Sequence, residues 1–501
     1  MKADLENTLY KTGSAFEEKC SKYAFYALLL YFVDIILLGT GGLTKIGPLS
    51  TRILFFGIAG LLSLPILFRN IKKLIKTPVV LFSAAFFVWM VIGGVIGFVK
   101  GNRTDIIKSD FMGYMNLLLL PTMLVIINSK ERLNTLFKAI AYSCGAVSVG
   151  AILLSFTNLM PFRDPLRHWL TDVGLCALSG MTSVAVRVFF HTGSRYMFAG
   201  LLIAFYFLLT EKGDRKRSLH WCGLMSLYIV GIFLSYTRAI YAACFVVAVA
   251  AFVFAAVSKK GLWKRILKAF GFAAACAVLF IILLGGVQKG QNLIKVAFYR
   301  ILLSTDLPSS MVGDDGGLID TSDGEMDKIS EDVQLGSEIR QAKKILLSES
   351  IVKSPVIGNG LGAAIKYHPE ILDRIEFEKE EEDASGDASG AAAAASANAA
   401  AIEKSLRSGY VEYFYHDIIN KLGIIGLALY LAPYIWMAVT TLRAGKSKHL
   451  MVSIAAFGSI SYFFVIAYFN PCMNTTVGIS CYMLAMTVMN MVSGDMEKTD
   501  K

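Results

Sequence analysis

Long apolar runs, each close to the length of a membrane-spanning helix, dominate this sequence from residue 22 onward. A helix needs about 20 predominantly apolar residues to cross roughly 30 Å of hydrocarbon, and it satisfies its own backbone hydrogen bonds there. Only 17% of the residues are charged and 55% are hydrophobic, which leaves too little charge to cover the cores of a soluble protein. The sequence therefore predicts an all-α polytopic membrane protein.

About twelve transmembrane helices are predicted. Short connections rich in Lys and Arg stay in the cytoplasm, and the basic clusters near residues 69–76, 130–132, 212–217, 259–268 and 443–448 all fall on the side of the N-terminus. We therefore expect both termini in the cytoplasm and one large loop outside it, with the chain divided into helices 1–9 (1–286), the loop (287–412) and helices 10–12 with a tail (413–501). The predicted spans are 22–40, 53–69, 79–99, 111–128, 135–156, 195–210, 219–237, 239–257, 267–286, 413–440, 450–469 and 474–492.

Charge and cysteine usage exclude several other classes. The net charge of +11 does not indicate nucleic-acid binding, because the basic residues occur in small groups between apolar runs instead of on one face. The eight cysteines form no CxxC pair, and most lie in apolar runs, where Cys behaves as a small hydrophobe. We expect no disulfide framework, no metal site and no cofactor.

Two connections on the outer side are longer than the others. Residues 157–194 mix aromatic, basic and apolar side chains, which favours a re-entrant or interfacial element. The large loop begins with an Asp- and Gly-rich stretch that does not match the spacing of a calcium loop, and a helix is expected from about Ser337 to Glu349. The tract 380–401 lacks aromatic and branched side chains, so we expect a mobile linker there.

Arg238 is the first candidate for chemistry. It ends the stretch Leu234-Ser235-Tyr236-Thr237-Arg238, where one apolar run gives way to the next at the outer surface. An ionisable residue within a span is costly and marks a functional site by default. One interpretation is an arginine that reaches the lipid headgroups. The other is a fixed guanidinium whose planar donor fork binds a phosphate or pyrophosphate.

Two further patterns lie in the second half of the large loop. Arg340 precedes a stretch, 354–362, in which glycines alternate after a proline, and such glycines let the backbone approach another backbone or a ligand closely. Glu412 and His416 lie four residues apart where the chain re-enters the membrane, so on a continuing helix they share one face. Either can accept a proton from a hydroxyl. A capping or interfacial role is the alternative for His416.

These motifs together resemble the bacterial O-antigen ligase and O-antigen polymerase superfamily over roughly residues 187–430. The shared features are many spans, a Ser-x-Ser/Thr-Arg at the outer start of a middle span, and a large external loop before the last helices. Within the loop, Arg340 with Pro355, Gly358 and Gly360 is similar to the family's arginine followed by Pro-x-x-Gly-x-Gly.

The last family motif begins His-Asn/Ser and ends Gly-x-x-Gly. Gly423 and Gly426 match its glycines, but the position of the family histidine holds Glu412, and His416 is one helical turn out of register. The missing histidine argues against a strict lipopolysaccharide ligase. A carboxylate can serve as the base if burial raises its pKa.

The resemblance implies a glycosyltransferase of the bacterial cytoplasmic membrane that acts at the outer face on glycans carried by undecaprenyl pyrophosphate. The stretch from Arg187 to His191, followed by Gly193 and Arg195 at the start of the predicted span 195–210, is similar to polymerase-type members, so polymerisation of surface polysaccharide repeats is favoured. In this hypothesis Arg238 and Arg340 bind the donor pyrophosphate and Arg187 or Arg195 assists. Glu412 or His416 deprotonates the acceptor, a second lipid-linked glycan. Membrane lipids and other polysaccharide-assembly proteins are further candidate partners.

Three alternatives stay open. A ligase moves a finished glycan to a lipid or protein acceptor and differs only in that acceptor. A transporter or flippase for the same glycans predicts paired broken helices or an internal repeat, and the sequence indicates neither. A non-catalytic scaffold or sensor has no need of external arginines at these places.

Overall fold

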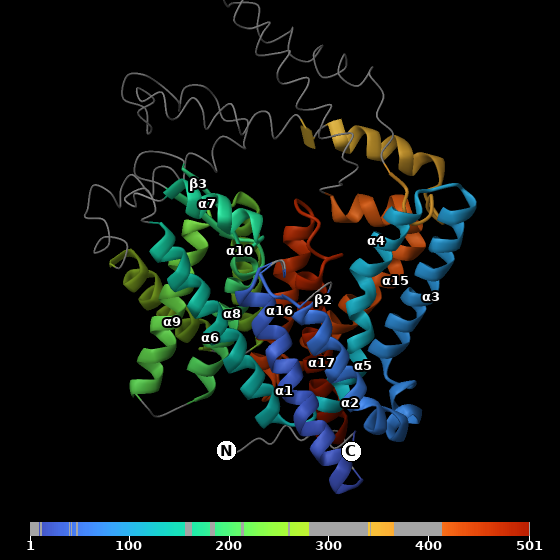
Figure 1. The fold of residues 1–501 in the computed structure, drawn as a ribbon. Coiled ribbons are helices and arrows are strands. Elements are labelled where there is room, and N and C mark those ends of the chain that lie inside the picture. The colour runs from blue at the N-terminus through green and yellow to red at the C-terminus, as the bar shows by residue number, and fades with distance from the viewer. Residues whose placement is uncertain are drawn as a thin grey trace, which may run out of the picture.

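A bundle of long helices that run up and down makes up most of the protein (Figure 1). The computed structural model describes residues 10, 13–39, 41, 43–46, 49–155, 163–180, 186–211, 215–258, 261–279, 339–340, 342–364 and 413–499. Within these residues, 11 segments are long and apolar enough to cross a membrane, and each coincides with a predicted span. The prediction of an all-α polytopic membrane protein is confirmed.

The ninth predicted span, 267–286, is helical over 262–279, and its last residues lie outside the described part of the chain. The acidic start of the large loop, the tract 380–401 and Glu412 also lie outside it. The eleven segments are α1 (Ala15–Leu37), α2 (Thr51–Leu74), α3 (Pro78–Val99), α4 to α5 (Thr104–Ile126), α6 (Lys130–Leu154), α8 (Gly193–Thr210), α9 (Arg215–Leu234), α10 (Arg238–Ser258), α15 (Phe414–Ala444), α16 (Leu450–Ala467) and α17 (Thr476–Thr499).

Local sequence sets several of the helix ends. Ser14 and Ser129 precede α1 and α6, and the side chain of each accepts a hydrogen bond from the backbone N–H three residues later. Such caps satisfy amides that have no partner within the helix. Pro78 begins α3, where its missing N–H costs nothing.

The two ends of the bundle differ in what they carry. α1 begins and α17 ends at one end, which we call the terminal face (Figure 1). The helical residues 342–353 and the connection between α6 and α8 lie at the other end, the loop face. The predicted helix 337–349 therefore has a counterpart in the structure, where the described residues 339–340 and 342–353 are helical and extend four residues beyond the predicted end.

The connection between α6 and α8 contains a short helix and a hairpin. α7 spans Arg163–Asp172, and the strands β3 (Cys176–Gly180) and β4 (Val186–Phe190) pair antiparallel, with Cys176 opposite Phe190. The sequence predicted an interfacial element for this stretch but no hairpin. The hairpin matters because it places Arg187 at the loop face.

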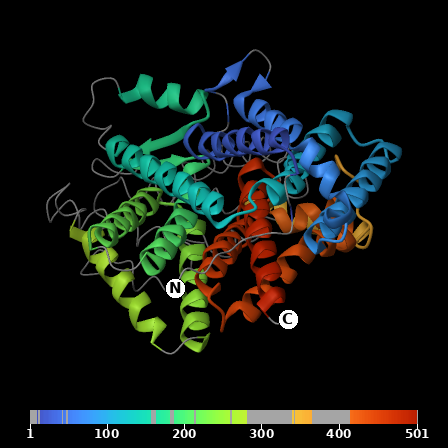
Figure 2. The ribbon, with the colours of Figure 1, turned by 90° about the horizontal axis from the view of Figure 1, so that it is seen from below.

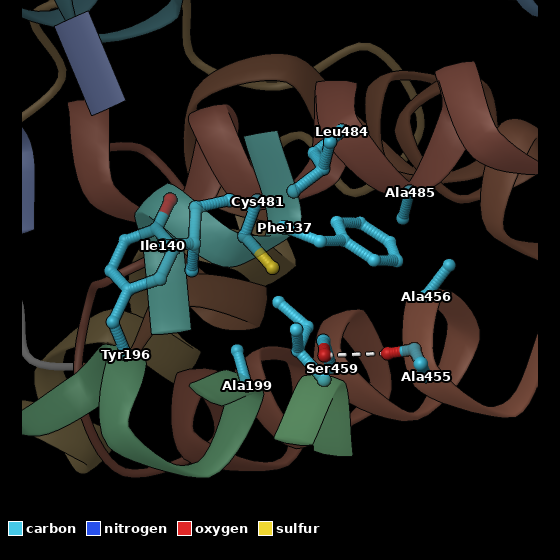
Figure 3. Close-up of a pocket in the computed structure, with 11 residues that line it drawn as sticks. Phe137, Ile140, Tyr196, Ala199, Ala455, Ala456, Ser459, Cys481, Leu484 and Ala485 are labelled. Atoms are coloured by element: carbon cyan, nitrogen blue, oxygen red, sulfur yellow. Dashed lines mark hydrogen bonds between the residues drawn. The ribbon is translucent and has the colours of Figure 1, made fainter. Parts of the chain in front are cut away.

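The core lies where α17 and α16 are surrounded by the other helices (Figure 2). Two of the buried tyrosine hydroxyls donate to backbone carbonyls, Tyr228 to Ala141 at 2.6 Å and Tyr430 to Met473 at 2.7 Å, which gives these two polar groups a hydrogen bond inside the bundle. An apolar gap between α6, α8, α16 and α17 has a volume of about 10 Å³ (Figure 3). It holds at most one water molecule and is too small for a substrate.

Candidate functional site

Arg238 begins α10 directly after a tight turn at the loop face. Tyr236, within that turn, is buried and has a φ of 43°, a left-handed conformation that costs an L-residue roughly 1–2 kcal/mol. Arg187 from β4 fastens the turn, because its Nε donates to the Ser235 carbonyl at 3.2 Å and its Nη2 donates to Thr237 Oγ1 at 3.4 Å. The hairpin thus supports the same motif that holds Arg238.

Three arginines from distant parts of the chain meet at this turn. Burial lowers the pKa of Arg187 from its ordinary value, and the positive charges of Arg238 and Arg340 lower it further. Charges shift a pKa only when they lie near the group. The structure therefore brings together the arginines that the sequence predicted to share one ligand.

Arg195, in the first turn of α8, extends the group. The guanidinium carbons of Arg187 and Arg195 lie 5.5 and 5.8 Å from the centre of the Phe189 ring, within the range of cation–π attraction. His191 also contacts this ring, at 5.9 Å between centroids. Burial lowers the pKa of His191, and Arg195 and Arg187 lower it further, so this histidine is neutral at pH 7.

We call Arg187, Arg195, Arg238 and Arg340 the arginine cluster. All four side chains are half-buried, and the first turn of α10 adds the partial positive charge of a helix N-terminus. The basic connections of the bundle otherwise gather mainly at the terminal face, so a concentration of arginines at the loop face is not explained by topology signals alone. The planar guanidinium groups donate several hydrogen bonds, and their positive charges attract an anion, so the cluster suits a bound phosphate or pyrophosphate.

Residues 339–364, which we call the arm, connect the arginine cluster to His416. Arg340 at the start of the arm acts on Arg187, and the positive charge of Lys344 acts on His416. These two arm residues are four apart, about 6 Å along a helix. The half-buried His416 side chain, whose ring centre lies 5.6 Å from that of Tyr413, thus lies near the arm that carries Arg340.

α15 begins at Phe414, and Tyr413 before it has extended backbone with φ −101° and ψ 100°. A helix that runs through both Glu412 and His416, on which their predicted common face depended, is therefore not formed. Glu412 itself lies outside the described residues, and its role as a base stays a prediction.

The predicted glycine motifs of the arm and of α15 fold against each other. Gly358 and Gly360 have φ of 80° and 86°, values open to glycine at little cost. The N–H of Gly360 donates to the Lys421 carbonyl at 3.0 Å, and that of Leu361 donates to the Gly93 carbonyl of α3 at 2.9 Å. A Cβ on Gly360 would lie 2.2 Å from the backbone of Gly97, so these glycines serve a backbone-to-backbone approach.

Gly423 breaks α15, with φ 70° and ψ −177°. The amides freed by the break are used by the arm, because Ile424 N–H donates to the Pro355 carbonyl at 2.9 Å and Ile425 N–H to the Val356 carbonyl at 3.3 Å. Gly426 follows one turn later, where a Cβ would press on Leu422 at 2.3 Å. The sequence identified both glycines but predicted an unbroken span.

A buried group of three charges fastens the arm, and the sequence did not single it out. Lys421 Nζ lies 2.8 Å from Asp110 Oδ1 of α4 and 2.8 Å from Asp417 Oδ1 of α15. The other Asp110 oxygen accepts from Gly362 N–H at 2.8 Å. We call these side chains the charge triad. Both Lys421 and Asp417 fall inside a predicted span, which was the available signal.

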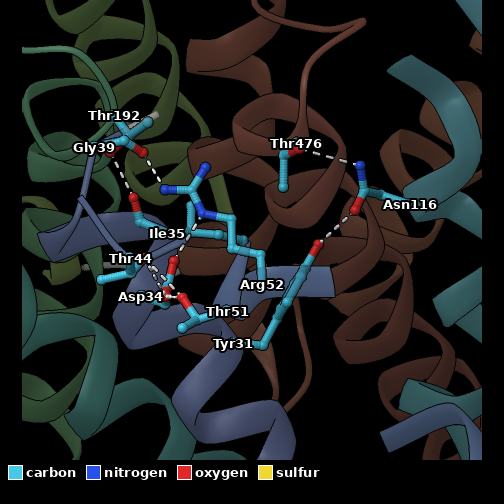
Figure 4. Close-up of polar contacts among 10 residues, drawn as sticks. All are labelled: Tyr31, Asp34, Ile35, Gly39, Thr44, Thr51, Arg52, Asn116, Thr192 and Thr476. Carbon is cyan, nitrogen blue, oxygen red and sulfur yellow. Dashed lines mark hydrogen bonds and ion pairs between the residues drawn. The ribbon is translucent and has the colours of Figure 1, made fainter. Parts of the chain in front are cut away.

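A second buried ion pair, also missed, joins α1 to α2 (Figure 4). Arg52 Nε lies 2.8 Å from Asp34 Oδ1, and the Arg52 guanidinium also donates to the Gly39 carbonyl. Thr51 donates to the second Asp34 oxygen. Because each charge has its partner and further hydrogen bonds, this pair serves as a structural connection.

No protein-family model matches the chain, and no curated protein matches its sequence. The assignment of a function therefore depends on the residues described above.

Proposed function

We propose that this protein is a membrane glycosyltransferase that polymerises oligosaccharide units linked to undecaprenyl pyrophosphate at the outer face of the bacterial cytoplasmic membrane. The observation that carries the proposal is the arginine cluster. Its members come from the β3–β4 hairpin, the starts of α8 and α10, and the arm, and all of them lie at the loop face. In the proposal the loop face is the outer face and both termini are cytoplasmic, in keeping with the basic connections of the terminal face.

The cluster acts on the leaving group of the donor. The bond between the anomeric carbon of the donor sugar and the pyrophosphate oxygen breaks, and the lipid pyrophosphate leaves with its electron pair. Negative charge builds on that oxygen, and fixed guanidiniums stabilise it more in the transition state than in the ground state. Arg238 and Arg340 are the proposed ligands. Arg187, which spends two of its donors on the Ser235–Thr237 turn, positions Arg238.

The acceptor sugar hydroxyl attacks the same carbon from the opposite side, and its proton passes to a base. His416 is the described candidate, because the charge of the arm residue Lys344, one helical turn from Arg340, lies near enough to act on it. Glu412 is the other candidate. Polymerisation is preferred over ligation because the family's motif histidine is replaced at residue 412. A ligase with a lipid or protein acceptor would use the same donor chemistry.

The broken α15 bears on the transporter alternative. Transporters use the free ends of interrupted helices to bind ions and substrates. Here the N–H groups of Ile424 and Ile425 donate to the arm, so the break is closed by backbone. This favours the glycosyltransferase.

Single substitutions in cells that depend on this protein for their polysaccharide test the proposal. Arg238→Ala and Arg340→Ala should shorten or abolish the polymer at normal expression, because each removes a ligand of the pyrophosphate. Arg103→Ala is the matched control, since Arg103 also lies at the loop face but its side chain is 74% exposed and pairs with Asp105. Normal polymer from Arg238→Ala would remove that residue from the mechanism, and normal polymer from both variants would refute the proposal.

A further inference from the structure

A hollow of about 520 Å³ opens at the terminal face, far from the arginine cluster. The end of α15, the start of α16 and the end of α17 surround it, and Arg443, Lys446, Lys448, His449 and Glu497 are among its lining residues. We call it the basic cleft. Its volume falls within the range of small-ligand sites, about 300–1,000 Å³, whereas a topology signal alone requires no hollow.

The charges of the cleft are only partly neutralised from within. Asp495 Oδ2 lies 3.4 Å from Lys448 Nζ and 2.9 Å from the buried His449 Nε2. Burial is the largest influence on the pKa of His449 and lowers it, so Lys448, and not His449, supplies positive charge beside Asp495 at pH 7. The side chains of Arg443 and Lys446 form no hydrogen bond or ion pair with any described residue, and both residues are exposed.

An apolar stripe on α15 leads to these two cations. Ile435, Val439 and Leu442 are 60%, 42% and 67% exposed, and their spacing of four and three residues places them on one side of the helix. Arg443 and Lys446 follow at the end of the stripe. An apolar surface that ends in unpaired positive charge matches an amphiphile with an anionic head.

We propose that the basic cleft binds the headgroup phosphate of an anionic phospholipid, with an acyl chain along the α15 stripe. A soluble anion would use the cations and leave the stripe unused. The site is independent of the proposed glycosyl transfer, although it lies on the helix whose other end carries His416.

Lipid binding by the purified full chain in detergent tests the proposal. Native mass spectrometry or thermal-shift titration would compare phosphatidylglycerol, phosphatidylcholine and inorganic phosphate. Each basic residue near an anionic headgroup contributes about 1 kcal/mol, so Arg443→Gln/Lys446→Gln should weaken phosphatidylglycerol binding about 30-fold, or about 2 kcal/mol. Arg443→Lys/Lys446→Arg keeps the charge and should bind normally.

Lys72→Gln/Lys76→Gln is the matched control, because it removes two exposed lysines at the terminal-face end of α2, outside the cleft. It should leave the affinity unchanged. The proposal is overturned if the wild type does not distinguish phosphatidylglycerol from phosphatidylcholine, or if the Gln variant in the cleft binds as well as the wild type. It is also overturned if inorganic phosphate competes at equal concentration, which would indicate a site for free anions.

Discussion

Lys421→Met removes the cation that lies between the buried carboxylate of Asp417 and the half-buried carboxylate of Asp110. Lys421, Asp110 and Asp417 have side chains that are 13%, 14% and 5% exposed, so solvent can replace little of the lost attraction. Removing one partner of a buried ion pair costs about 3–5 kcal/mol, because the remaining charge stays buried without compensation. We expect the arm to detach from α3 and α15 in this variant.

Hydrogen exchange measures the detachment directly. The amides of Gly360, Leu361 and Gly362 donate to Lys421, Gly93 and Asp110 at 2.8–3.0 Å, and they exchange only when the arm opens. A loss of about 3–5 kcal/mol raises the open population by roughly two to three and a half powers of ten. The peptide that contains residues 355–364 should therefore lose its protection in Lys421→Met by that factor.

Two further variants separate charge from simple truncation. Asp110→Asn leaves one lysine facing one carboxylate and an oxygen for Gly362 N–H, so the arm should stay docked with a smaller loss of protection. Lys100→Met removes contacts of an exposed lysine to the carbonyl of Gly358 and the side chain of Asn359 at 3.3 and 3.4 Å, which are worth about 1 kcal/mol or less. Wild-type exchange of residues 355–364 in Lys421→Met would refute the account of the triad as the fastener of the arm.

Three other predictions concern stability. Gly423→Ala forces a side chain into a left-handed conformation and places its Cβ 2.0 Å from the Val356 carbonyl, so the free energy of unfolding should fall by more than the roughly 1–2 kcal/mol of the conformation alone. Gly57→Ala, with open space around it, should be neutral or slightly stabilising. Equal effects of the two substitutions in thermal unfolding would contradict the docking geometry. Asp34→Asn should lower the free energy of unfolding by about 3–5 kcal/mol, because the Arg52 side chain, which is 10% exposed, loses its carboxylate partner. The control Arg69→Gln breaks an ion pair whose arginine is 51% exposed, and it should cost less than about 1 kcal/mol. The lowered pKa of His191 means that the unfolded chain binds the proton more readily than the folded chain. The free energy of unfolding should therefore fall as the pH drops from about 6.5 toward the folded pKa. His191→Gln should flatten this part of the curve of stability against pH, and an unchanged curve would contradict the assigned environment.

Sequence reasoning predicted the helices well because the bilayer imposes a simple rule. A run of about 20 apolar residues has few other structures available in hydrocarbon. The rule says nothing about breaks within a run, however. Gly423 lies in a long apolar stretch, and its kink depends on backbone partners some 67 residues earlier, at Val356.

The arginine cluster was predictable as a set but not as a geometry. Each of its members lies beside an apolar run or a motif, so each could be singled out. Arg187 fastens the Ser235–Thr237 turn because the β3–β4 hairpin places it there. The two strands of this hairpin are short and lie in an irregular connection, so the sequence did not predict them. Asp110 and Lys421 are 311 residues apart, so their pairing could not be read from the sequence. The available signal for the triad was that charged residues lie within or beside predicted spans.

Turnover by the purified protein in liposomes tests the central proposal most directly. The substrate is a synthetic oligosaccharide on undecaprenyl pyrophosphate, presented at the loop face, and the readouts are polymer length and free lipid pyrophosphate. The account predicts one lipid pyrophosphate released for each glycosidic bond formed, with both readouts lost in Arg238→Ala and Arg340→Ala and retained in Arg103→Ala. Movement of intact lipid-linked glycan across the bilayer without release of lipid pyrophosphate would contradict it.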